Sequence, residues 1–536
     1  MNREEFYNLL SEQSLNSPNV TAVYSSGLTV AWSELLNEVH QRMAWIKRHQ
    51  IKRLGLLADN SVNWILWDLA ALFSNIIIVP IPGYFSLQQK QHALEQAAID
   101  CVLSDNEALA SELGLNIAEE RILGTGISHC DYFVFRINTE TCSVHLIHDE
   151  TAKITFTSGS TGEPKGVMLS AENMLNVADS LAQSLRKTQV KKHDCILPLA
   201  TLLENIAGVY APFLVGAEVQ VSAMSEVGIK GASELDIELF VKGLHQRAGE
   251  SLILLPQLLL ALVSSIEFGA AVPSQLKFIA VGGARVSESL LRKAQSLDLP
   301  IYQGYGLSEN GSVCCLNTPE SSFLGSVGRP LPHNQVRISL QGEIQVKGNQ
   351  MLGYLGGDRP SNEWLSTGDM GYLNTEGFLF IEGRKKNVFI TSFGRNVNPE
   401  WIEGELCSTY EIAQAVVCGE AKASNIAIIF PRFTRSELQN SELQNSELQN
   451  SELQNSELQN SELQNSGQQI TDQQLQQAID QVNIRLPDYA RVKQWIRADI
   501  PFSFENGLAT SNGRPKRQNI LNFFSAQMST LYEHAS

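Results

Sequence analysis

Residues 157–166 read TSGSTGEPKG, and no other stretch constrains the fold and the chemistry of this chain as strongly. Three glycines within eight residues permit positive φ angles and close backbone approach, so that successive N–H groups can point at an anion. Four hydroxyl side chains and Lys165 surround these glycines, although the spacing of the Walker phosphate loop is absent. Because residues 153–156 alternate and residues 168–182 have a helical composition, we expect a phosphate-binding loop between a strand and a helix.

The length and the composition limit the class of protein that this chain can belong to. The 536 residues are 43% hydrophobic and 18% charged, which is typical of a globular chain large enough for about three structural units. The longest apolar run, residues 252–263, is too short to cross a bilayer, and the first residues lack the pattern of a secretory signal. We therefore expect a cytoplasmic protein without a transmembrane segment.

The net charge and the cysteines limit which ligands, metal sites and disulfides the chain can be expected to have. A net charge of −17 argues against nucleic acid, and anionic ligands such as ATP would need local basic groups. The eight cysteines are scattered without a CxxC pair, so neither a zinc site nor a disulfide framework is indicated. We expect mostly buried, reduced thiols.

The first 150 residues alternate between strand and helix patterns. Short strands are predicted at residues 53–58, 76–82 and 100–103, and helices at residues 32–49, 60–73 and 87–98. Strands that alternate with helices favour an α/β fold with a mainly parallel sheet covered on both faces. We expect this region to be scaffold, without residues that take part in chemistry.

A second group of residues suits a nucleotide. Residues 302–309, YQGYGLSE, set Tyr305 between two glycines, which gives a flat surface that a purine can approach. Within the same stretch, Glu309 is a hard oxygen ligand suited to Mg²⁺. Residues 276–284 predict a buried strand that ends in a glycine turn before a helix, a place where ligands often sit.

A third stretch, residues 366–369, reads STGD and follows an expected hairpin over residues 336–346. It sets Asp369 on a glycine turn, where a short carboxylate can accept hydrogen bonds from both hydroxyls of a ribose. The sequence thus offers candidate groups for phosphate, adenine and ribose in separate stretches.

These stretches, in this order, resemble the motifs of the adenylate-forming superfamily, which includes acyl-CoA synthetases, luciferases and carrier-loading adenylation domains. Residues 383–387 and 394–403 are similar to the hinge and to the small-domain glycine turn of that family. The resemblance covers nearly the whole chain. It implies an α/β fold with a large N-terminal domain over residues 1–383, which contains mainly parallel sheets flanked by helices and a small β-barrel-like part. A hinge at 384–386 and a small, mobile α+β domain over 387–536 would follow.

The resemblance also implies roles in ATP binding. Lys165 and the loop hydroxyls would hold the triphosphate, Tyr305 would stack on adenine, and Glu309 with Thr161 would bind Mg²⁺. Lys165 and Glu309 would count as catalytic residues. The implied nucleotide-binding residues are Thr157, Ser158, Gly159, Ser160, Thr161, Gly162, Gly283, Ala284, Gly304, Tyr305, Gly306, Ser308, Asp369 and Arg384.

Further implied roles concern the ribose and the second half of the reaction. Asp369 and Arg384 would hold the ribose. Lys386 would act as the hinge residue, and Gly394 would approach the pantetheine arm of CoA after the small domain rotates.

Residues 197–205 precede an apolar helix that runs to Gly216, and in the family this region forms one wall of the acyl pocket. Thr201 stands where relatives often carry His or an aromatic residue. A helix start capped by Thr201, with Glu204 three residues on, explains the stretch on local grounds. The apolar wall, and residues 505–508, which look like those of the long-chain synthetases, suggest a fatty acid substrate.

The sequence SELQN repeats six times over residues 436–465. A period of five matches neither strand nor helix periodicity. We therefore expect a disordered or loosely helical surface loop without a catalytic role, between a strand at 425–430 and a helix at 472–486.

Residues 510–517, TSNGRPKR, fit the closing motif of the family except at one position. Arg514 stands where relatives carry a catalytic lysine, and arginine differs from lysine in reach and in fork geometry. Lys516 could take over the role, because residues i and i+2 share a face in an extended segment. Both stay candidates for the catalytic cation.

The sequence therefore predicts ATP-dependent activation of a carboxylic acid, here a fatty acid, to an acyl-adenylate, followed by transfer to the thiol of CoA. ATP, Mg²⁺ and CoA are the expected cofactors. Two alternatives stay open: transfer to the phosphopantetheine of an acyl carrier protein, and an adenylate-binding protein with weak catalytic activity, which Arg514 motivates. The oligomeric state is not indicated.

Overall fold

The computed structural model describes residues 1–113, 117–122, 132–136, 146–157, 164–230, 234–432, 470–510 and 513–534. They group into two compact units. The large unit comprises residues 1–385 and 509–514, and the small unit comprises residues 386–508 and 515–536. The division falls between residues 385 and 386, within the expected hinge at 384–386, whose role stays a prediction.

A nine-stranded sheet forms one part of the large unit. Its strands, in spatial order, are β18 (Arg329–Pro330), β17 (Cys315–Leu316), β16 (Ile301–Tyr305), β15 (Phe278–Val281), β14 (Ser251–Leu254), β10 (Lys192–Cys195), β11 (Glu218–Val221), β1 (Thr21–Ser25) and β2 (Leu28–Ala31). The strands from β16 to β1 are parallel, and the strands outside them pair antiparallel. Several candidate site residues therefore follow carboxyl ends of this sheet.

An eight-stranded sheet forms the second part of the large unit. Its strands, in spatial order, are β21 (Gly353–Tyr354), β9 (Lys165–Ser170), β8 (Thr151–Thr157), β4 (Ile77–Pro80), β3 (Arg53–Leu57), β5 (Cys101–Ser104), β7 (Tyr132–Arg136) and β6 (Ile117–Ile122). The central strands β8, β4, β3 and β5 run parallel, whereas both flanks are antiparallel. The sheet is therefore mixed, with the expected parallel pairing at its centre.

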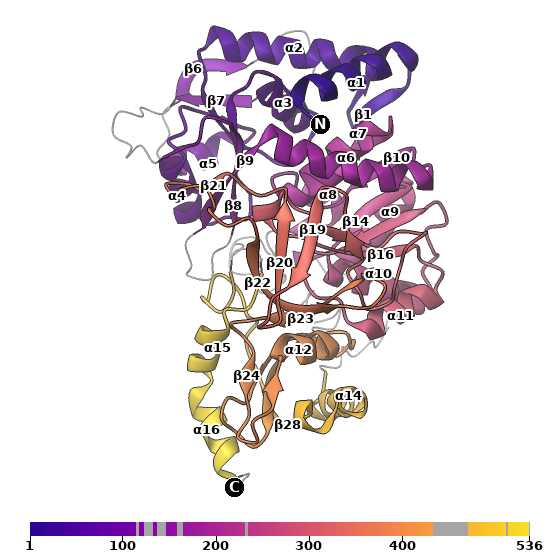
Figure 1. The fold of residues 1–536 in the computed structure, drawn as a ribbon, viewed down its shortest axis with the longest axis vertical. Coiled ribbons are helices and arrows are strands. Elements are labelled where there is room, and N and C mark those ends of the chain that lie inside the picture. The colour runs from indigo at the N-terminus through magenta and orange to yellow at the C-terminus, as the bar shows by residue number, and fades with distance from the viewer. Residues whose placement is uncertain are drawn as a thin grey trace, which may run out of the picture. The chain divides into compact units, whose positions relative to one another are not determined.

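A third, four-stranded antiparallel sheet comprises β19 (Asn334–Ile338), β20 (Glu343–Gly348), β22 (Leu365–Leu373) and β23 (Leu379–Arg384). A two-stranded ribbon of β12 (Ile229–Lys230) and β13 (Glu234–Leu235) completes the strands described in this unit. The α/β fold class, with large flanked sheets and a small barrel-like part, is thus confirmed (Figure 1).

Helices cover the sheets of the large unit. They are α1 (Arg3–Asn16), α2 (Trp32–Arg48), α3 (Val62–Phe73), α4 (Leu87–Gln96), α5 (Glu107–Glu112), α6 (Ala171–Thr188), the π-helix η2 (Glu204–Tyr210), α7 (Ala211–Leu214), α8 (Met224–Val227), α9 (Ile237–Arg247), α10 (Pro256–Glu267), α11 (Glu288–Ser296) and the 3₁₀ turn η3 (Ser308–Asn310). Across the described ranges, no helix combines the length and the hydropathy needed to cross a membrane.

Helix α3 is buried on all sides and carries a charge in its interior. Asp68 lies among apolar residues of this helix, and its Oδ1 accepts a hydrogen bond from Lys153 Nζ at 2.7 Å. Asp68 Oδ2 accepts from Asn205 Nδ2 at 2.9 Å and from Tyr210 Oη at 2.6 Å. Because Lys153 lies on β8, this buried network fixes the strand that leads to Thr157 and the glycine-rich loop.

The glycine-rich loop joins two strands, so the expectation of a strand followed directly by a helix was wrong. β9 pairs antiparallel with β8, from Thr157 opposite Lys165 to Thr151 opposite Ser170. The side chain of Ser170 then caps α6. Residues 167–169 are fully buried, because β9 lies between β8 and β21 rather than on the surface of a helix.

The small unit is an α+β structure. Its three-stranded sheet contains β26 (Ile412–Cys418), β27 (Asn425–Pro431) and β28 (Val492–Arg497), and its short ribbon contains β24 (Phe389–Ile390) and β25 (Asn396–Val397). Its helices are α12 (Pro399–Cys407), α14 (Asp472–Arg485), the 3₁₀ turn η4 (Asp488–Ala490), α15 (Arg517–Phe523) and α16 (Ser525–His534). α12 and α14 contribute to one apolar cluster, and α15 and α16 contribute to another. The predicted strand at 425–430 and helix at 472–486 are confirmed.

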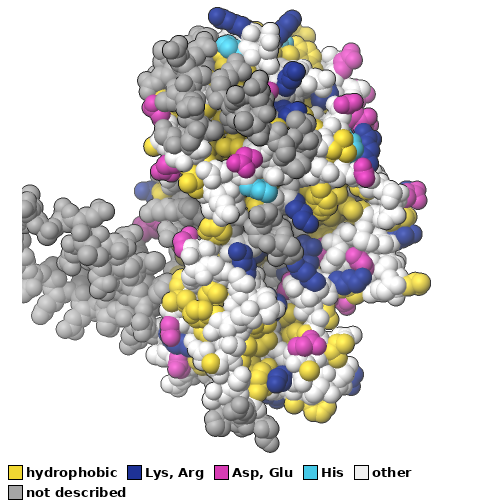
Figure 2. All heavy atoms as spheres, turned by 90° about the vertical axis from the view of Figure 1, so that its left-hand side faces the viewer, with side chains coloured by type: hydrophobic (Ala, Val, Ile, Leu, Met, Phe, Trp, Pro, Cys, Tyr) yellow, Lys and Arg dark blue, Asp and Glu magenta, His cyan; other side chains and the backbone are white. Residues whose placement is uncertain are grey.

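Charged side chains are mixed on the surface. Figure 2 shows Lys and Arg side chains interspersed with acidic, hydrophobic and polar ones on one face. The SELQN repeats at 436–465 lie outside the described residues.

Candidate functional site

Two strands hold the ends of the glycine-rich loop. Thr157 is the last residue of β8 and Lys165 the first of β9, and the two pair across the hairpin. The Thr157 hydroxyl donates to the Lys165 carbonyl at 3.4 Å. The candidates Ser158, Gly159, Ser160, Thr161 and Gly162 lie outside the described residues.

Lys165 and Glu309, which are far apart in the sequence, both contact Tyr354 on β21. The Lys165 ammonium lies 5.6 Å from the centre of the Tyr354 ring, within the range of a cation–π interaction. The Tyr354 hydroxyl donates to Glu309 Oε1 at 2.8 Å. Burial, and next the charge of Glu309, raise the pKa of Tyr354, so this phenol stays a proton donor at neutral pH. The tyrosine therefore connects a phosphate-binding candidate with a metal-binding candidate.

Glu309 is held on the short turn η3 directly after β16. Its backbone carbonyl accepts from the N–H of Met351 at 2.8 Å, which ties this turn to the segment that leads into β21. Ser308 begins the same turn, and its carbonyl accepts from the Gly311 N–H at 3.1 Å. The carboxylate of Glu309 offers hard oxygen ligands of the kind that Mg²⁺ prefers.

Tyr305, Asp369 and Arg384 form a second group. The Tyr305 hydroxyl donates to Asp369 Oδ2 at 2.5 Å, and Arg384 Nε lies 2.9 Å from Asp369 Oδ1. Asp369 and Arg384 also face each other across the pair β22 and β23. Burial, and then the negative charge of Asp369, raise the pKa of Tyr305 well above its ordinary value. Tyr305 and Arg384 therefore both bind the carboxylate of Asp369, and the three residues come from separate motifs.

Asp369 lies within a strand, so its expected location on a glycine turn was wrong. The segment 365–373 is β22, and its pairing with β20 and β23 contains register shifts. Gly368 has a φ of +73° at this irregularity, which glycine adopts without strain. Because this irregularity requires a glycine, the sequence around Asp369 resembles that of a turn.

Glycines are required at two of the candidate positions. A Cβ at Gly306 would lie 1.5 Å from the carbonyl oxygen of Ser312, so no other residue fits beside Tyr305 without a backbone shift. Gly283 has a φ of +79° in the turn between β15 and α11. Ala284 is exposed in the same turn, and Gly304 lies near the end of β16.

Arg514 and Lys516 lie in different units. Arg514 belongs to the large unit, where its Nη2 donates to the carbonyl of Gly283 at 3.0 Å. Lys516 belongs to the small unit, where its ammonium lies 5.9 Å from the ring centre of Phe504. The two candidates for the catalytic cation thus have different surroundings.

The remaining candidates belong to the small unit. Lys386 is exposed and is the first residue of this unit. Gly394 lies in the turn between β24 and β25, with a φ of +71°, and its N–H donates to the carbonyl of Thr391 at 2.9 Å. In the same unit, Arg517 of the closing motif pairs with Glu403 at 2.5 Å.

The predicted cap at Thr201 does not form. The Thr201 hydroxyl donates to the carbonyl of Pro198 at 2.6 Å. Glu204 is instead fully buried, and its carboxylate faces His193 at 3.7 Å. The apolar residues that follow, up to Leu214, belong to a hydrophobic core cluster, so their apolar character is explained without an acyl ligand.

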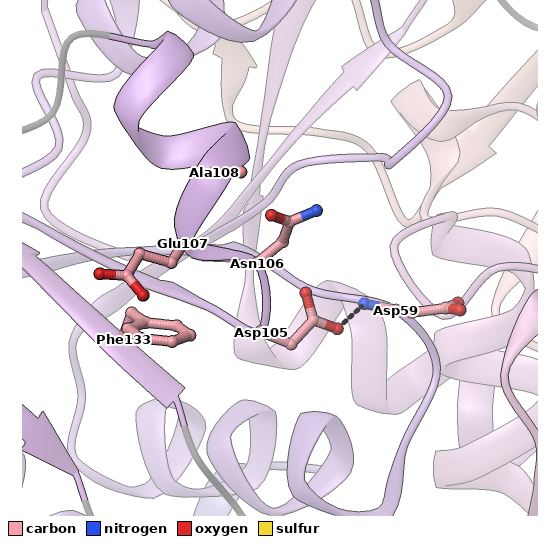
Figure 3. A pocket seen from close by; sticks show the side chains of 6 residues that line it. All are labelled: Asp59, Asp105, Asn106, Glu107, Ala108 and Phe133. Carbon is pink, nitrogen blue, oxygen red and sulfur yellow. Dashed lines mark hydrogen bonds between the residues drawn. The ribbon is translucent and has the colours of Figure 1, made fainter. Parts of the chain in front are cut away.

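A surface pocket of the large unit contains none of the candidate residues. It is lined by Asp59, Asp105, Asn106, Glu107, Ala108 and Phe133 (Figure 3). The N–H of Asp59 donates to Asp105 Oδ2 at 2.8 Å, and burial raises the pKa of both carboxyl groups. Its acidic lining does not suit a phosphate ligand.

Sequence reasoning missed Tyr354. Residues 353–357 read GYLGG, which resembles the GYG pattern around Tyr305 except that Leu355 follows the tyrosine. This pattern was a usable signal. The contact with Glu309 depends on β21 joining the sheet at β9, and local sequence does not reveal such a pairing.

The sequence profile of the AMP-binding enzyme family matches residues 10–355, which is more than half of the chain. The chain therefore belongs to the family of AMP-binding enzymes. The matched region includes Lys165, Glu309 and Tyr354, and it ends before Asp369 and Arg514.

The individual relatives share only a modest sequence identity with this chain. A 2-succinylbenzoate–CoA ligase of Bacillus licheniformis is 26% identical over 432 residues, which cover 77% of this chain and 86% of the relative. A long-chain fatty acid–CoA ligase of Mycobacterium bovis is 25% identical over 432 residues, covering 69% of this chain and 71% of the relative. The structure of O-succinylbenzoate coenzyme A synthetase from Bacillus subtilis, in complex with ATP and magnesium ion, matches with a TM-score of 0.67 at 21% identity. The match covers 95% of this chain and 98% of the synthetase chain, and it shows that the two proteins share the fold.

Proposed function

We propose that this enzyme activates a carboxylic acid with ATP and transfers the acyl group to CoA. In the first step a carboxylate oxygen attacks the α-phosphorus of ATP, an acyl–O–P bond forms, and pyrophosphate leaves. In the second step the thiol of CoA attacks the acyl carbon, a thioester forms, and AMP leaves while the thiol proton passes to solvent or a base. Membership in the AMP-binding enzymes and the similarity to two kinds of CoA ligase support this proposal.

The contact of Lys165 and Glu309 with one tyrosine is the observation that carries the proposal. A cation for phosphate and a carboxylate for a divalent ion are needed side by side when a triphosphate reacts. Lys165 and Thr157, together with the loop residues Ser158, Gly159, Ser160, Thr161 and Gly162, would hold the phosphates. Glu309, with Thr161, would hold Mg²⁺, which supplies positive charge to the triphosphate when it is bound.

The group around Asp369 would hold the nucleoside. Asp369 would accept from the ribose hydroxyls, because a carboxylate can accept several hydrogen bonds at once. Tyr305 would stack on adenine, with Gly304 and Gly306 leaving room for the ring. Gly283, Ala284 and Ser308 would line the same nucleotide.

Arg514 is the better candidate for the cation that orients the acyl carboxylate. Its guanidinium already contacts the Gly283 carbonyl within the large unit, beside the turn proposed to face the nucleotide. Lys516 belongs to the small unit, where its ammonium lies near the ring of Phe504. In the second step Lys386 would act as the hinge and Gly394 would face the pantetheine arm of CoA.

The acid is either a long-chain fatty acid or a compound like 2-succinylbenzoate, since relatives of both kinds match. The apolar stretch before Leu214 does not separate the two, because its side chains already serve the core. A carrier-protein phosphopantetheine is the alternative acceptor to CoA.

The test is pyrophosphate release with ATP and Mg²⁺, over fatty acids of increasing length and 2-succinylbenzoate, with and without CoA or an acyl carrier protein that bears a free phosphopantetheine thiol. Release that depends on one acid and increases with CoA is the expected result, and it names the substrate. If the carrier protein increased release and CoA did not, the carrier protein would be the acceptor. ATP binding without release for any acid would contradict the proposal and favour an adenylate-binding protein.

A further inference from the structure

Three side chains that can bind a metal ion meet inside the large unit, and none of them has a role in the proposed reaction. His193 and Cys195 lie on β10, and Glu204 lies on η2. Their exposed fractions are 3%, 0% and 0%. One ligand atom from each residue lies within 4.8 Å of the other two.

Local structure explains why these side chains meet. Successive residues of a strand point to opposite faces, so His193 and Cys195 share the face of β10 that η2 covers. Asp194, between them, pairs instead with Arg247 at 2.9 Å. Gly208 of η2 keeps the space open, because a Cβ there would lie 2.9 Å from Glu204 Oε1 and 3.0 Å from His193 Nε2.

Three polar atoms of this cluster lack hydrogen bonds, whereas His193 Nδ1 contacts Ser251 and the Cys195 thiol donates to the Gly208 carbonyl at 3.5 Å. Among the described residues, His193 Nε2 and both carboxylate oxygens of Glu204 are buried and find no hydrogen-bond partner. The nearest approach between them is 3.7 Å, from Nε2 to Oε1. His193 Nδ1 lies 2.9 Å from Ser251 Oγ, so a proton on Nδ1 would leave Nε2 with a free lone pair that faces Glu204. Unpaired buried polar atoms are costly, and a cation would satisfy all three.

We propose that His193, Cys195 and Glu204 form a binding site for Zn²⁺. Thiolate, imidazole and carboxylate are the ligands that zinc prefers, and Zn–ligand bonds of about 2.0–2.3 Å place tetrahedral ligands about 3.3–3.8 Å apart. Small side-chain rotations would bring the present atoms to that spacing. The ion would balance one thiolate and one carboxylate, which makes the buried cluster neutral.

The ion would act on structure. Because zinc ligands bind in their deprotonated forms, the ion would bind to the thiolate of Cys195, the carboxylate of Glu204 and the neutral imidazole of His193. It would join β10 to η2, the helix that also supplies Asn205 and Tyr210 to the buried network of Asp68. This site is independent of the proposed reaction.

The test measures metal in the full chain after unfolding with a chelator and refolding with Zn²⁺ or Co²⁺. The wild type is expected to retain one equivalent of zinc after gel filtration, and the Co²⁺ form to show a thiolate-to-cobalt absorption band. Cys195→Ser and Glu204→Gln should lose the equivalent and the band. Cys101→Ser, which changes a fully buried cysteine on β5, is the matched control and should keep both.

Two outcomes would overturn the proposal: refolded wild type that retains no stoichiometric metal, or full retention in folded Cys195→Ser and Glu204→Gln. Should Cys195→Ser fail to fold, as judged by circular dichroism, Glu204→Gln decides alone, because it keeps the shape of the side chain. Gly208→Ala should also lower the metal content, because its methyl group would occupy the space beside both ligands.

Discussion

The hydroxyl of Tyr354 donates a hydrogen bond to the carboxylate of Glu309 at 2.8 Å. The ring of the same tyrosine lies under the ammonium of Lys165. One aromatic side chain thus fixes the positions of a cation and an anion that the proposed reaction would use on the same triphosphate.

Tyr354→Phe should raise the Mg²⁺ concentration needed for half-maximal pyrophosphate release by about tenfold, the expected effect of losing one hydrogen bond to a charged group. Tyr354→Ala should be more severe, because it also removes the ring beneath Lys165. Tyr372→Phe, which removes an exposed hydroxyl of β22, is the matched control. A Mg²⁺ dependence that Tyr354→Phe leaves unchanged would show that the tyrosine does not orient Glu309.

Arg514→Ala should lower pyrophosphate release by about 100-fold or more, because it removes the positive charge that we propose orients the acyl carboxylate. Arg514→Lys should recover part of this loss, since it keeps the charge but not the fork. Lys516→Ala should have little effect on this step. Single-turnover formation of the acyl-adenylate measures each variant, and the reverse order of the two alanine variants would assign the role to Lys516.

The sequence predicted the fold class and many of the element positions, because short apolar strands and amphipathic helices have clear periodicities. It also pointed to Tyr305, Asp369 and Arg384, which the structure brings together. It mistook β9 for the start of a helix. The three apolar residues 167–169 do not distinguish a strand from a helix, and the choice depends on pairing with β8 and β21.

Contacts between distant segments were beyond sequence reasoning. Lys153 looked like an ordinary polar residue of an alternating strand, but its partner Asp68 lies 85 residues earlier. His193, Cys195 and Glu204 lack the spacing of a metal motif, and only the packing of η2 on β10 brings them together. In each case the chemistry depends on tertiary packing and leaves no local pattern.

The stability of the protein should depend on His333 in mildly acidic solution. Burial lowers the pKa of His333 from 6.5 to about 4, and its ring contacts the Ser180 hydroxyl at 2.7 Å and the Val313 carbonyl at 3.0 Å. The unfolded chain therefore binds one more proton than the folded chain between these two pKa values. The free energy of unfolding should fall as the pH decreases through this window, by about 2 kcal/mol between pH 7 and pH 5, with no contribution from His333 above it.

Urea unfolding at pH 7 and pH 5 measures this effect. His333→Gln cannot titrate and should lose less stability than the wild type between the two pH values. His40→Gln, which changes an exposed histidine, is the control and should behave like the wild type. An equal loss in the wild type and in His333→Gln would contradict the assignment.

Lys153→Met should lower the free energy of unfolding by about 3–5 kcal/mol, because it leaves the Asp68 carboxylate buried without its cation. The double variant with Asp68→Leu should regain part of that loss, as both charges are then absent. Lys192→Met, which breaks a half-buried pair with Glu218 at 3.6 Å, is the control and should cost less than about 1 kcal/mol. Denaturant unfolding that finds equal losses at Lys153 and Lys192 would contradict this account of the buried pair.

The pair of Lys153 and Asp68 also restricts how this sequence can change by mutation. A mutation of either residue alone leaves the other as an unpaired buried charge. Replacement of both together avoids this unpaired charge. The two positions should therefore vary as a unit between related chains, even though they lie on different elements and neither is proposed to touch a substrate. Asn205 and Tyr210, which share the Asp68 carboxylate, should vary with them.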